Sequence, residues 1–220
     1  MYFVFVAQRG LDKSILMNNT DYMRRGFTLV ELLIVIGLLG AISLIVIAAI
    51  NPIEQANRAR DARFRADGGQ IISAVERYFA SRSSFPWEGC AGASCTTTSE
   101  EAFGFVSASD NAVGLCSGAN CAAAGILVTG DELKSEFIAR DFIKATAVDK
   151  KVFIGKGQGS SASVYACYIP LSKAARDTAI TNLKIRSLSF DANGIPSANS
   201  ACTTANDNWG QSGCYVCIPE

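Results

Sequence analysis

Residues 23–52, MRRGFTLVELLIVIGLLGAISLIVIAAINP, decide how this chain is organised. An apolar run over residues 27–50 follows two arginines and a glycine, and Glu31 is the only charged residue in the run. About 20 apolar residues in a helix cross the hydrocarbon core of a membrane. The run therefore predicts a membrane-spanning helix, and Arg24 and Arg25 predict that its amino-terminal end stays in the cytoplasm.

A cleaved secretory signal peptide is the alternative interpretation of this run. The apolar region of a signal peptide is usually shorter and ends in a small-residue cleavage site. Here the small residue, Gly26, precedes the apolar run instead of following it. The order of these features favours a helix that is retained in the mature chain.

The position of Glu31 suggests a purpose for its charge. A carboxylate within a membrane span costs about 2.5–3.5 kcal/mol on insertion scales, so it usually has a partner. Glu31 lies four residues after Phe27, which is about one helical turn. A cut between Gly26 and Phe27 would create an amino group at a similar depth, which Glu31 of a neighbouring subunit could neutralise. This pattern predicts the packing of identical helices.

The overall composition disfavours an enzyme. Lysine plus arginine and aspartate plus glutamate both number 20, so no global charge directs the chain to nucleic acid or acidic lipid. The sequence contains no histidine. This removes His-dependent catalytic triads and most zinc and haem sites.

The cysteines indicate the compartment of the remaining chain. All eight follow the apolar run: Cys90, Cys95, Cys116, Cys121, Cys167, Cys202, Cys214 and Cys217. An even number in this location predicts disulfides in an oxidising compartment, and therefore an exported domain. The simplest local pairs are Cys90 with Cys95 and Cys116 with Cys121, although eight cysteines allow about 105 pairings. Metal binding by these pairs is the alternative, and it is disfavoured in an exported chain without histidine.

A Cys-x-x-Cys sequence, Cys214 to Cys217, lies near the carboxyl end. Such a pair can serve in a thiol oxidoreductase. No βαβ pattern accompanies it, so a cross-link that holds the last strand is the preferred interpretation.

Residues 24–42, RRGFTLVELLIVIGLLGAI, resemble the class III leader junction and amino-terminal helix of type IV pilins and pseudopilins. The resemblance implies that a membrane prepilin peptidase cuts after Gly26 and that Phe27 is then N-methylated. It also implies that Glu31 guides assembly into a helical filament. Residues 1–26 would be the leader; because leaders in this family are often short, Met23 is an alternative start. Many pilins close a carboxy-terminal loop with a disulfide, which suggests that Cys202 pairs with Cys214 or Cys217.

A second helical segment is expected over residues 51–84. Its apolar side chains form one stripe that should hold the globular domain: Phe64, Ile71, Ile72, Val75, Tyr78 and Phe79. Small residues on a second face should allow contact with other subunits: Ala59, Ala62, Ala66 and Ala80. Gly37, Gly40 and Pro52 weaken the helix. By resemblance to the family's filaments, a kink or local unwinding between Gly37 and Pro52 is expected on assembly.

The arginine cluster of residues 58–65, RARDARFR, permits a nucleic-acid interpretation. Its arginines project in different directions around the helix, so DNA binding is not indicated. Asp61 with Arg65 and Asp67 with Arg63 have the i, i+4 spacing of ion pairs, which is the preferred interpretation.

Residues 85–220 are expected to form the exported globular domain, which begins with a long variable connection. One short helix is expected within residues 130–147, and strands within 151–155, 163–170 and 183–191. The DANG sequence at 191–194 predicts a turn. No cofactor is required, although Asp191, Asn193 and Asp207 are weak calcium candidates, because some major pseudopilins bind calcium in such loops.

Together these patterns predict an α+β, pilin-like fold: a long amino-terminal helix, membrane-spanning in its first half, packed against a small antiparallel β-sheet with disulfide-linked loops. The predicted function is that of a non-catalytic pilus subunit that forms a homopolymer. Its implied partners are the prepilin peptidase and an inner-membrane assembly platform with its ATPase. It would wait in the inner or cytoplasmic membrane and end in an extracellular pilus. The alternatives are a pseudopilin of a type II secretion system, in a periplasmic pseudopilus, and a membrane-anchored exported protein that does not polymerise.

Overall fold

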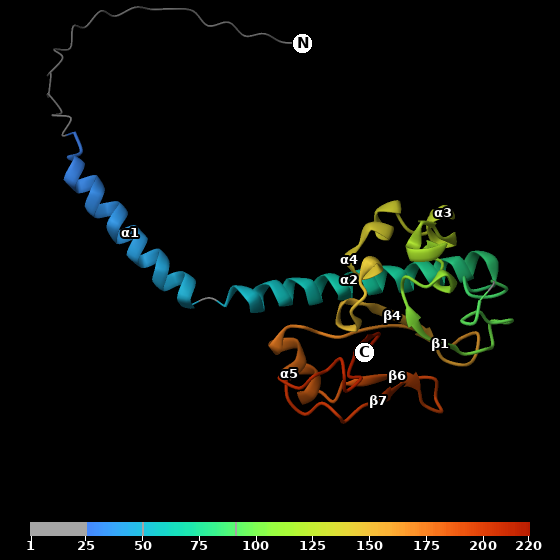
Figure 1. The fold of residues 1–220 in the computed structure, drawn as a ribbon. Coiled ribbons are helices and arrows are strands. Elements are labelled where there is room, and N and C mark those ends of the chain that lie inside the picture. The colour runs from blue at the N-terminus through green and yellow to red at the C-terminus, as the bar shows by residue number, and fades with distance from the viewer. Residues whose placement is uncertain (1–25, 50, 91) are drawn as a thin grey trace, which may run out of the picture. The chain divides into compact units, whose positions relative to one another are not determined.

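The computed structural model describes residues 26–49, 51–90 and 92–220. The expected leader, apart from Gly26, and the alternative start at Met23 lie outside the described residues. The chain divides into an amino-terminal unit, which contains helix α1, and a globular unit, Asn51–Glu220 (Figure 1).

Helix α1, Leu29–Ala49, runs through Gly37 and Gly40 without interruption. Helix α2, Pro52–Arg82, begins separately. The side chain of Asn51 accepts a hydrogen bond from the backbone N–H of Glu54 at 3.2 Å, and Pro52 occupies the first helical turn, where its missing N–H costs nothing. Pro52 therefore starts a helix in this chain. The unwinding expected on assembly stays a prediction about the filament.

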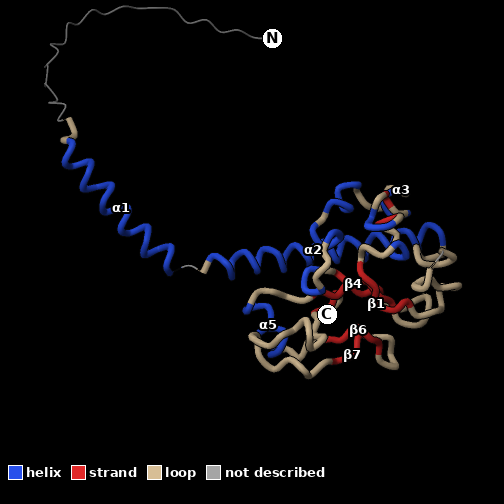
Figure 2. The backbone as a smooth tube through the Cα atoms, in the orientation of Figure 1, coloured by secondary structure: helices blue, strands red, loops and turns tan. Residues whose placement is uncertain are grey.

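The globular unit is built on a four-stranded antiparallel sheet with the strand order β1–β4–β5–β8. The strands are β1 (Phe103–Ser107), β4 (Val152–Lys156), β5 (Val164–Tyr168) and β8 (Val216–Ile218). Helix α2 packs against β5 and β8, and Figure 2 shows it running beside the sheet. This arrangement confirms the predicted α+β fold.

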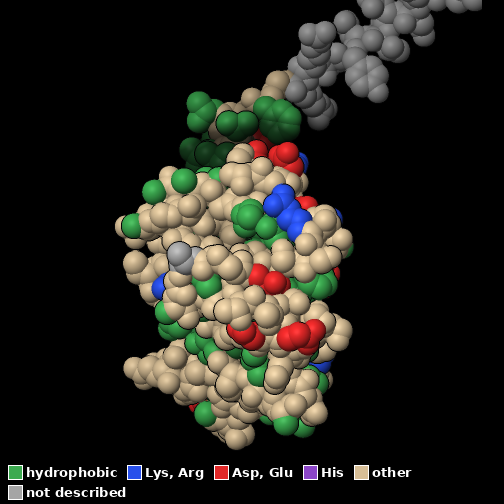
Figure 3. Space-filling model, turned by 90° about the vertical axis from the view of Figure 1, so that its right-hand side faces the viewer, with side chains coloured by type: hydrophobic (Ala, Val, Ile, Leu, Met, Phe, Trp, Pro, Cys, Tyr) green, Lys and Arg blue, Asp and Glu red, His purple; other side chains and the backbone are tan. Residues whose placement is uncertain are grey.

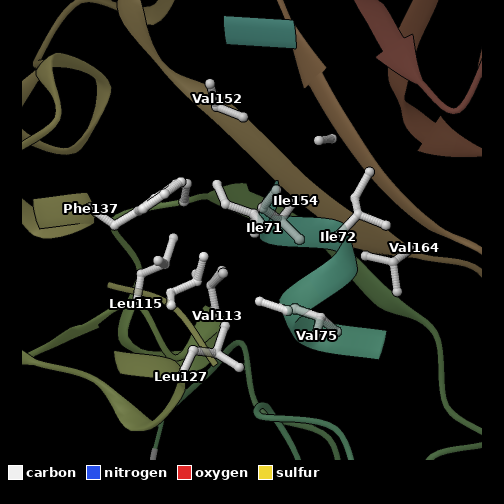
Figure 4. Packing of buried hydrophobic residues seen from close by; sticks show 14 of the residues in the cluster. Ile71, Ile72, Val75, Val113, Leu115, Leu127, Phe137, Val152, Ile154 and Val164 are labelled. Atoms are coloured by element: carbon white, nitrogen blue, oxygen red, sulfur yellow. The ribbon is translucent and has the colours of Figure 1, made fainter. Parts of the chain in front are cut away.

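Side chains alternate across the sheet, as a strand requires. Val164, Ala166 and Tyr168 of β5 join the core beneath α2, whereas Tyr165 and Cys167 join a second core on the opposite face. The predicted apolar stripe of α2 supplies the first core, and Figure 4 shows its isoleucines near strands β4 and β5. Each fully buried aliphatic or aromatic side chain contributes about 1.5–3 kcal/mol.

Gly68 lets α2 approach the sheet closely. A Cβ atom at Gly68 would lie 3.1 Å from the Cβ of Ala166 and 3.4 Å from the Cδ1 of Ile218. These contacts are tighter than ordinary packing distances. A small residue is therefore needed where the helix crosses β5 and β8.

The connection from α2 to β4 was expected to be long and variable; it is long, and it contains β1, a stack of aromatic rings and several short elements. Phe79, Phe85, Trp87 and Phe103 stack in sequence, with ring centroids 4.3, 4.9 and 4.2 Å apart, and Phe103 begins β1. The single short helix expected within residues 130–147 is divided into two short helices, η3 and α4, whose bounds follow. The connection contains these elements: η1 (Asn111–Val113), β2 (Cys116–Ser117), η2 (Ala119–Cys121), β3 (Ala123–Ala124), α3 (Ile126–Thr129), η3 (Ser135–Ala139), α4 (Asp141–Lys144) and η4 (Val148–Lys150).

The carboxy-terminal third covers the other face of the sheet. It contains α5 (Lys173–Thr181) and a two-stranded sheet of β6 (Arg186–Phe190) and β7 (Pro196–Ala198), and β6 contacts β1. The strand expected at residues 183–191 starts later, because Leu183 is 83% exposed and has a positive φ of 53°. On the face of the globular unit seen in Figure 3, charged side chains are scattered among polar ones.

Candidate functional site

The candidate site is the start of α1 and the peptide before it. Gly26 and Phe27 lie in an irregular segment just before α1, and Phe27 is 77% exposed. A Cβ atom at Gly26 would meet no atom within 4 Å. The backbone at the predicted cleavage point is thus accessible in this chain, as a peptidase substrate requires.

Thr28 fixes the first turn of α1. Its Oγ1 accepts a hydrogen bond from the backbone N–H of Glu31 at 3.2 Å, and its carbonyl accepts one from the N–H of Leu32 at 3.2 Å. Thr-x-x-Glu is the sequence of a helix capping box, and a carboxylate in the first turn also complements the helix dipole. The Thr-x-x-Glu spacing is the signal in the sequence from which this cap could have been predicted. The hydrogen bond uses the backbone of Glu31, so its carboxylate stays available for the predicted role in assembly.

The remainder of α1 is an apolar surface with no cover in the isolated chain. Residues Leu29–Ile47 are long and apolar enough to span a membrane, and none of them is buried. Such a surface needs lipid or other helices around it. Within this surface, the hydroxyl of Ser43 donates a hydrogen bond to the carbonyl of Leu39 at 2.7 Å. The carboxylate of Glu31 has no such internal partner among the described residues, so it needs one from lipid or from another subunit.

The first three turns of α2 hold the segment that starts α5. The carboxylate of Asp61 accepts hydrogen bonds from the backbone N–H groups of Leu171 and Ser172, at 2.9 and 2.8 Å. The carboxylate of Glu54 accepts from Lys173 and Ala174, at 3.0 and 3.2 Å. These are the free N–H groups of a helix amino terminus, where negative charge is favourable. The backbone hydrogen bonds lower the pKa of Glu54.

The arginine cluster forms ion pairs, but not the predicted ones. Asp61 lies 3.5 Å from Arg60, and Asp67 lies 3.6 Å from Arg140. Arg65 instead pairs with Glu220. Asp61 and Asp67 are buried against the rest of the globular unit, so tertiary partners replace the i, i+4 partners available along the helix surface.

The eight cysteines form four disulfides: Cys90–Cys95, Cys116–Cys121, Cys167–Cys217 and Cys202–Cys214. Cys202 therefore pairs with Cys214, which is one of the two partners that the resemblance suggested for it. Cys214 and Cys217 are not bonded to each other, which leaves no dithiol pair for redox exchange. Cys217 joins β8 to β5 and fixes the edge of the sheet.

The weak calcium candidates have other roles. Oδ1 of Asp191 accepts hydrogen bonds from the N–H groups of Asn193 and Ile195, at 2.8 and 3.0 Å, which forms the predicted turn. The carboxylate of Asp207 accepts from the backbone of Thr203 and Thr204, at 2.6 and 2.8 Å. Among the described residues, no three His, Cys, Asp or Glu side chains gather into a metal site.

One protein-family model matches the chain, the prokaryotic N-terminal methylation motif, over residues 22–47. No curated protein and no solved structure matches. The matched segment covers the junction at Gly26 and Phe27, the capping pair of Thr28 and Glu31, and most of α1.

Proposed function

We propose that this chain, a type IV pilin- or pseudopilin-like protein with the N-terminal methylation motif of that family, is a structural subunit of a type IV pilus. The family is structural and not enzymatic. In the proposed function, prepilin peptidase cuts after Gly26, Phe27 is methylated, and α1 anchors the subunit in the membrane before assembly.

The observation that carries the proposal is the exposed apolar surface of α1 with Glu31 in its first turn. Lipid covers this surface before assembly, and neighbouring α1 helices would replace lipid in the filament. Glu31 would then meet the amino group of Phe27 on an adjacent subunit, which offsets the cost of the buried carboxylate. The inner-membrane platform and its ATPase would supply the work of extraction.

The disulfides support a pilus over a type II secretion pseudopilus. Four cross-links in a globular unit of 170 residues, Asn51–Glu220, suit a subunit that is exposed outside the cell. A membrane-anchored protein that does not polymerise would leave Glu31 without a charged partner.

The first test is the intact mass and amino-terminal sequence of the protein from its native membrane. A chain that begins at N-methylated Phe27 supports the proposal. A chain that begins at Met1 or Met23 contradicts processing, and Glu31 would then need another partner. Electron microscopy of sheared filaments, with antibody to the globular unit, separates a polymerised subunit from a processed but monomeric one.

A further inference from the structure

A cavity of about 560 Å³ opens between α2 and the segment around α4. Arg60 and Arg63 line it from α2, and Arg140 and Lys150 line it from the opposite wall. This volume is within the range of small-ligand sites. Two carboxylates, Asp67 and Asp141, also line it, so the lining holds more positive than negative charge.

Two guanidinium N–H groups in the walls lack acceptors. Nη1 of Arg60 and Nε of Arg140 are buried and have no hydrogen-bond partner among the described residues. Buried donors of this kind normally have a protein or water partner. Both arginines line the same cavity, Arg60 from α2 and Arg140 from the opposite wall, while these two N–H groups are themselves shielded from solvent.

The nearby carboxylates do not satisfy these donors. Oδ1 of Asp61 is 3.5 Å from Nη1 of Arg60 and already accepts the N–H of Leu171. Oδ1 of Asp67 is 3.6 Å from Nη2 of Arg140, which is a different nitrogen from the unmet Nε. Both distances are longer than a charge-assisted hydrogen bond, which is about 2.7–2.9 Å.

The positions of Arg60 in the wall and of Arg63 and Lys150 at the surface favour a small anion over a polymeric one as the ligand. Arg60 stacks on the ring of Phe64, 4.2 Å from its centroid, and donates to the carbonyl of Asp149, which holds its guanidinium in the wall. Arg63 and Lys150 are exposed, so they can approach an entering ligand without disturbing the core. A concave site with fixed donors at the wall and mobile cations at the surface suits a compact oxyanion.

We propose that this cavity binds an oxyanion of the carboxylate or phosphate class, with Arg63 and Lys150 as direct ligands and Arg60 and Arg140 as the positive wall. The anion has two sources, a free small molecule or a carboxylate side chain of a second copy of this chain. The inference is independent of the proposed pilus function.

The test is calorimetric titration of the full-length chain in nonionic detergent with phosphate and with citrate, against sodium chloride at matched ionic strength. We expect saturable binding of one of the two anions. In the Arg63→Gln/Lys150→Gln variant the binding should be at least tenfold weaker. The Lys134→Gln/Lys144→Gln variant loses the same charge from exposed lysines outside the cavity and should bind within twofold of the native chain.

Equal binding by the two double variants would overturn the proposal, because the anion would then respond to net charge alone. If the native chain binds neither anion, self-association measured by light scattering assigns the source. Self-association that is lost in Arg63→Gln/Lys150→Gln and kept in the control supports a carboxylate from a second copy. Absent or unchanged self-association, together with absent anion binding, overturns the proposal. Thermal unfolding of each variant verifies that it is folded.

Discussion

The carboxylate of Asp61 accepts a hydrogen bond from the backbone N–H of Ser172 at 2.8 Å, although 111 residues separate the two in sequence. Ser172 is the N-cap of α5, and its hydroxyl accepts from the N–H of Ala175 at 3.2 Å. One buried carboxylate on α2 therefore fixes the place where α5 begins.

Asp61→Ala should destabilise the globular unit by about 3 kcal/mol. The substitution removes two charge-assisted hydrogen bonds, each with a net contribution of about 1.5–3 kcal/mol, and leaves their buried donors unmet. Urea unfolding of the detergent-solubilised chain measures the change. Asp177→Ala, which removes an exposed carboxylate of α5, is the control and should change stability by less than about 0.5 kcal/mol. Equal effects would mean that Asp61 contributes only charge.

The contribution of Glu54 to the stability of the globular unit should depend on pH. Hydrogen bonds from the backbone of Lys173 and Ala174 lower its folded-state pKa below the ordinary value of about 4.3. The unfolded state then binds protons first as pH falls, so the stabilisation is present above about pH 4.3 and is lost as pH falls through the folded pKa.

Thermal unfolding midpoints of the native chain and Glu54→Gln, compared between neutral pH and pH 2, measure this dependence. The difference between the two should shrink at low pH. Glu76→Gln, at an exposed position on the same helix, should show no such trend. A difference that stays constant with pH would show that the carboxylate charge is not the stabilising feature.

The disulfide that closes a long loop should contribute more to the free energy of unfolding than one that closes a short loop. Cys167–Cys217 closes a sequence separation of 50, whereas Cys90–Cys95 closes one of 5. Loop-closure entropy assigns about 4 kcal/mol to the first and about 2 kcal/mol to the second. Unfolding of the Cys167→Ala/Cys217→Ala and Cys90→Ala/Cys95→Ala variants compares them.

A thiol assay on the denatured, unreduced native chain gives an independent measure of the cross-links. It should detect essentially no free thiol, because every cysteine is paired. Eight titratable thiols would contradict the cross-linked globular unit and the exported location inferred from it.

Gly26→Arg should leave the unprocessed precursor in the membrane. The accessible backbone at residue 26 suits cleavage only while the residue before the cut is small, as the family's peptidase requires. Mass spectrometry of membrane fractions detects the retained leader. Gly104→Arg, at an exposed position of β1 where a Cβ would meet no atom within 4 Å, is a control for the added charge and should be processed normally if the chain reaches the membrane. Normal processing of Gly26→Arg would reject the cleavage assignment.

Glu31→Ala should be processed but should enter filaments at least tenfold less than the native chain. The loss removes the proposed partner of the Phe27 amine. Because Thr28 Oγ1 accepts from the backbone of residue 31, the start of α1 should persist in the variant. Quantitative immunoblots of sheared filaments measure incorporation. A native filament yield would show that the Glu31 carboxylate is not needed for assembly.

The parts of the fold that depend on local pattern could be predicted from the sequence. Apolar periodicity identified the stripe of α2, and short spacing identified the Cys90–Cys95 and Cys116–Cys121 pairs. The parts that depend on contacts between residues far apart in the chain could not be predicted from the sequence. Asp61 has a usable partner at i+4 along the helix, and only the folded chain shows that Leu171 and Ser172 bind it instead.

Strand β1 was missed for a similar reason. Phe103–Ser107 lies at the sheet edge, and its place is set by the stack of Phe103 on Trp87 and by pairing with β4. The features of the candidate site are contiguous in sequence, so they could be read from it directly, while the roles of Gly26, Phe27 and Glu31 in cleavage and assembly stay predictions. The capping role of Thr28 was also readable, through the Thr-x-x-Glu spacing.

The Cys116–Cys121 bridge closes a loop whose tip lies outside the core. Residues 117–120 are exposed, while Leu115 and Cys116 are buried, so the bridge fixes both ends of a solvent-facing loop to the interior. Exposed loop tips with fixed ends tolerate insertion best. A short epitope inserted after Gly118 should therefore bind antibody on intact cells without loss of the fold. This loop is thus the preferred insertion site for an epitope that follows the proposed path of the subunit from membrane to surface.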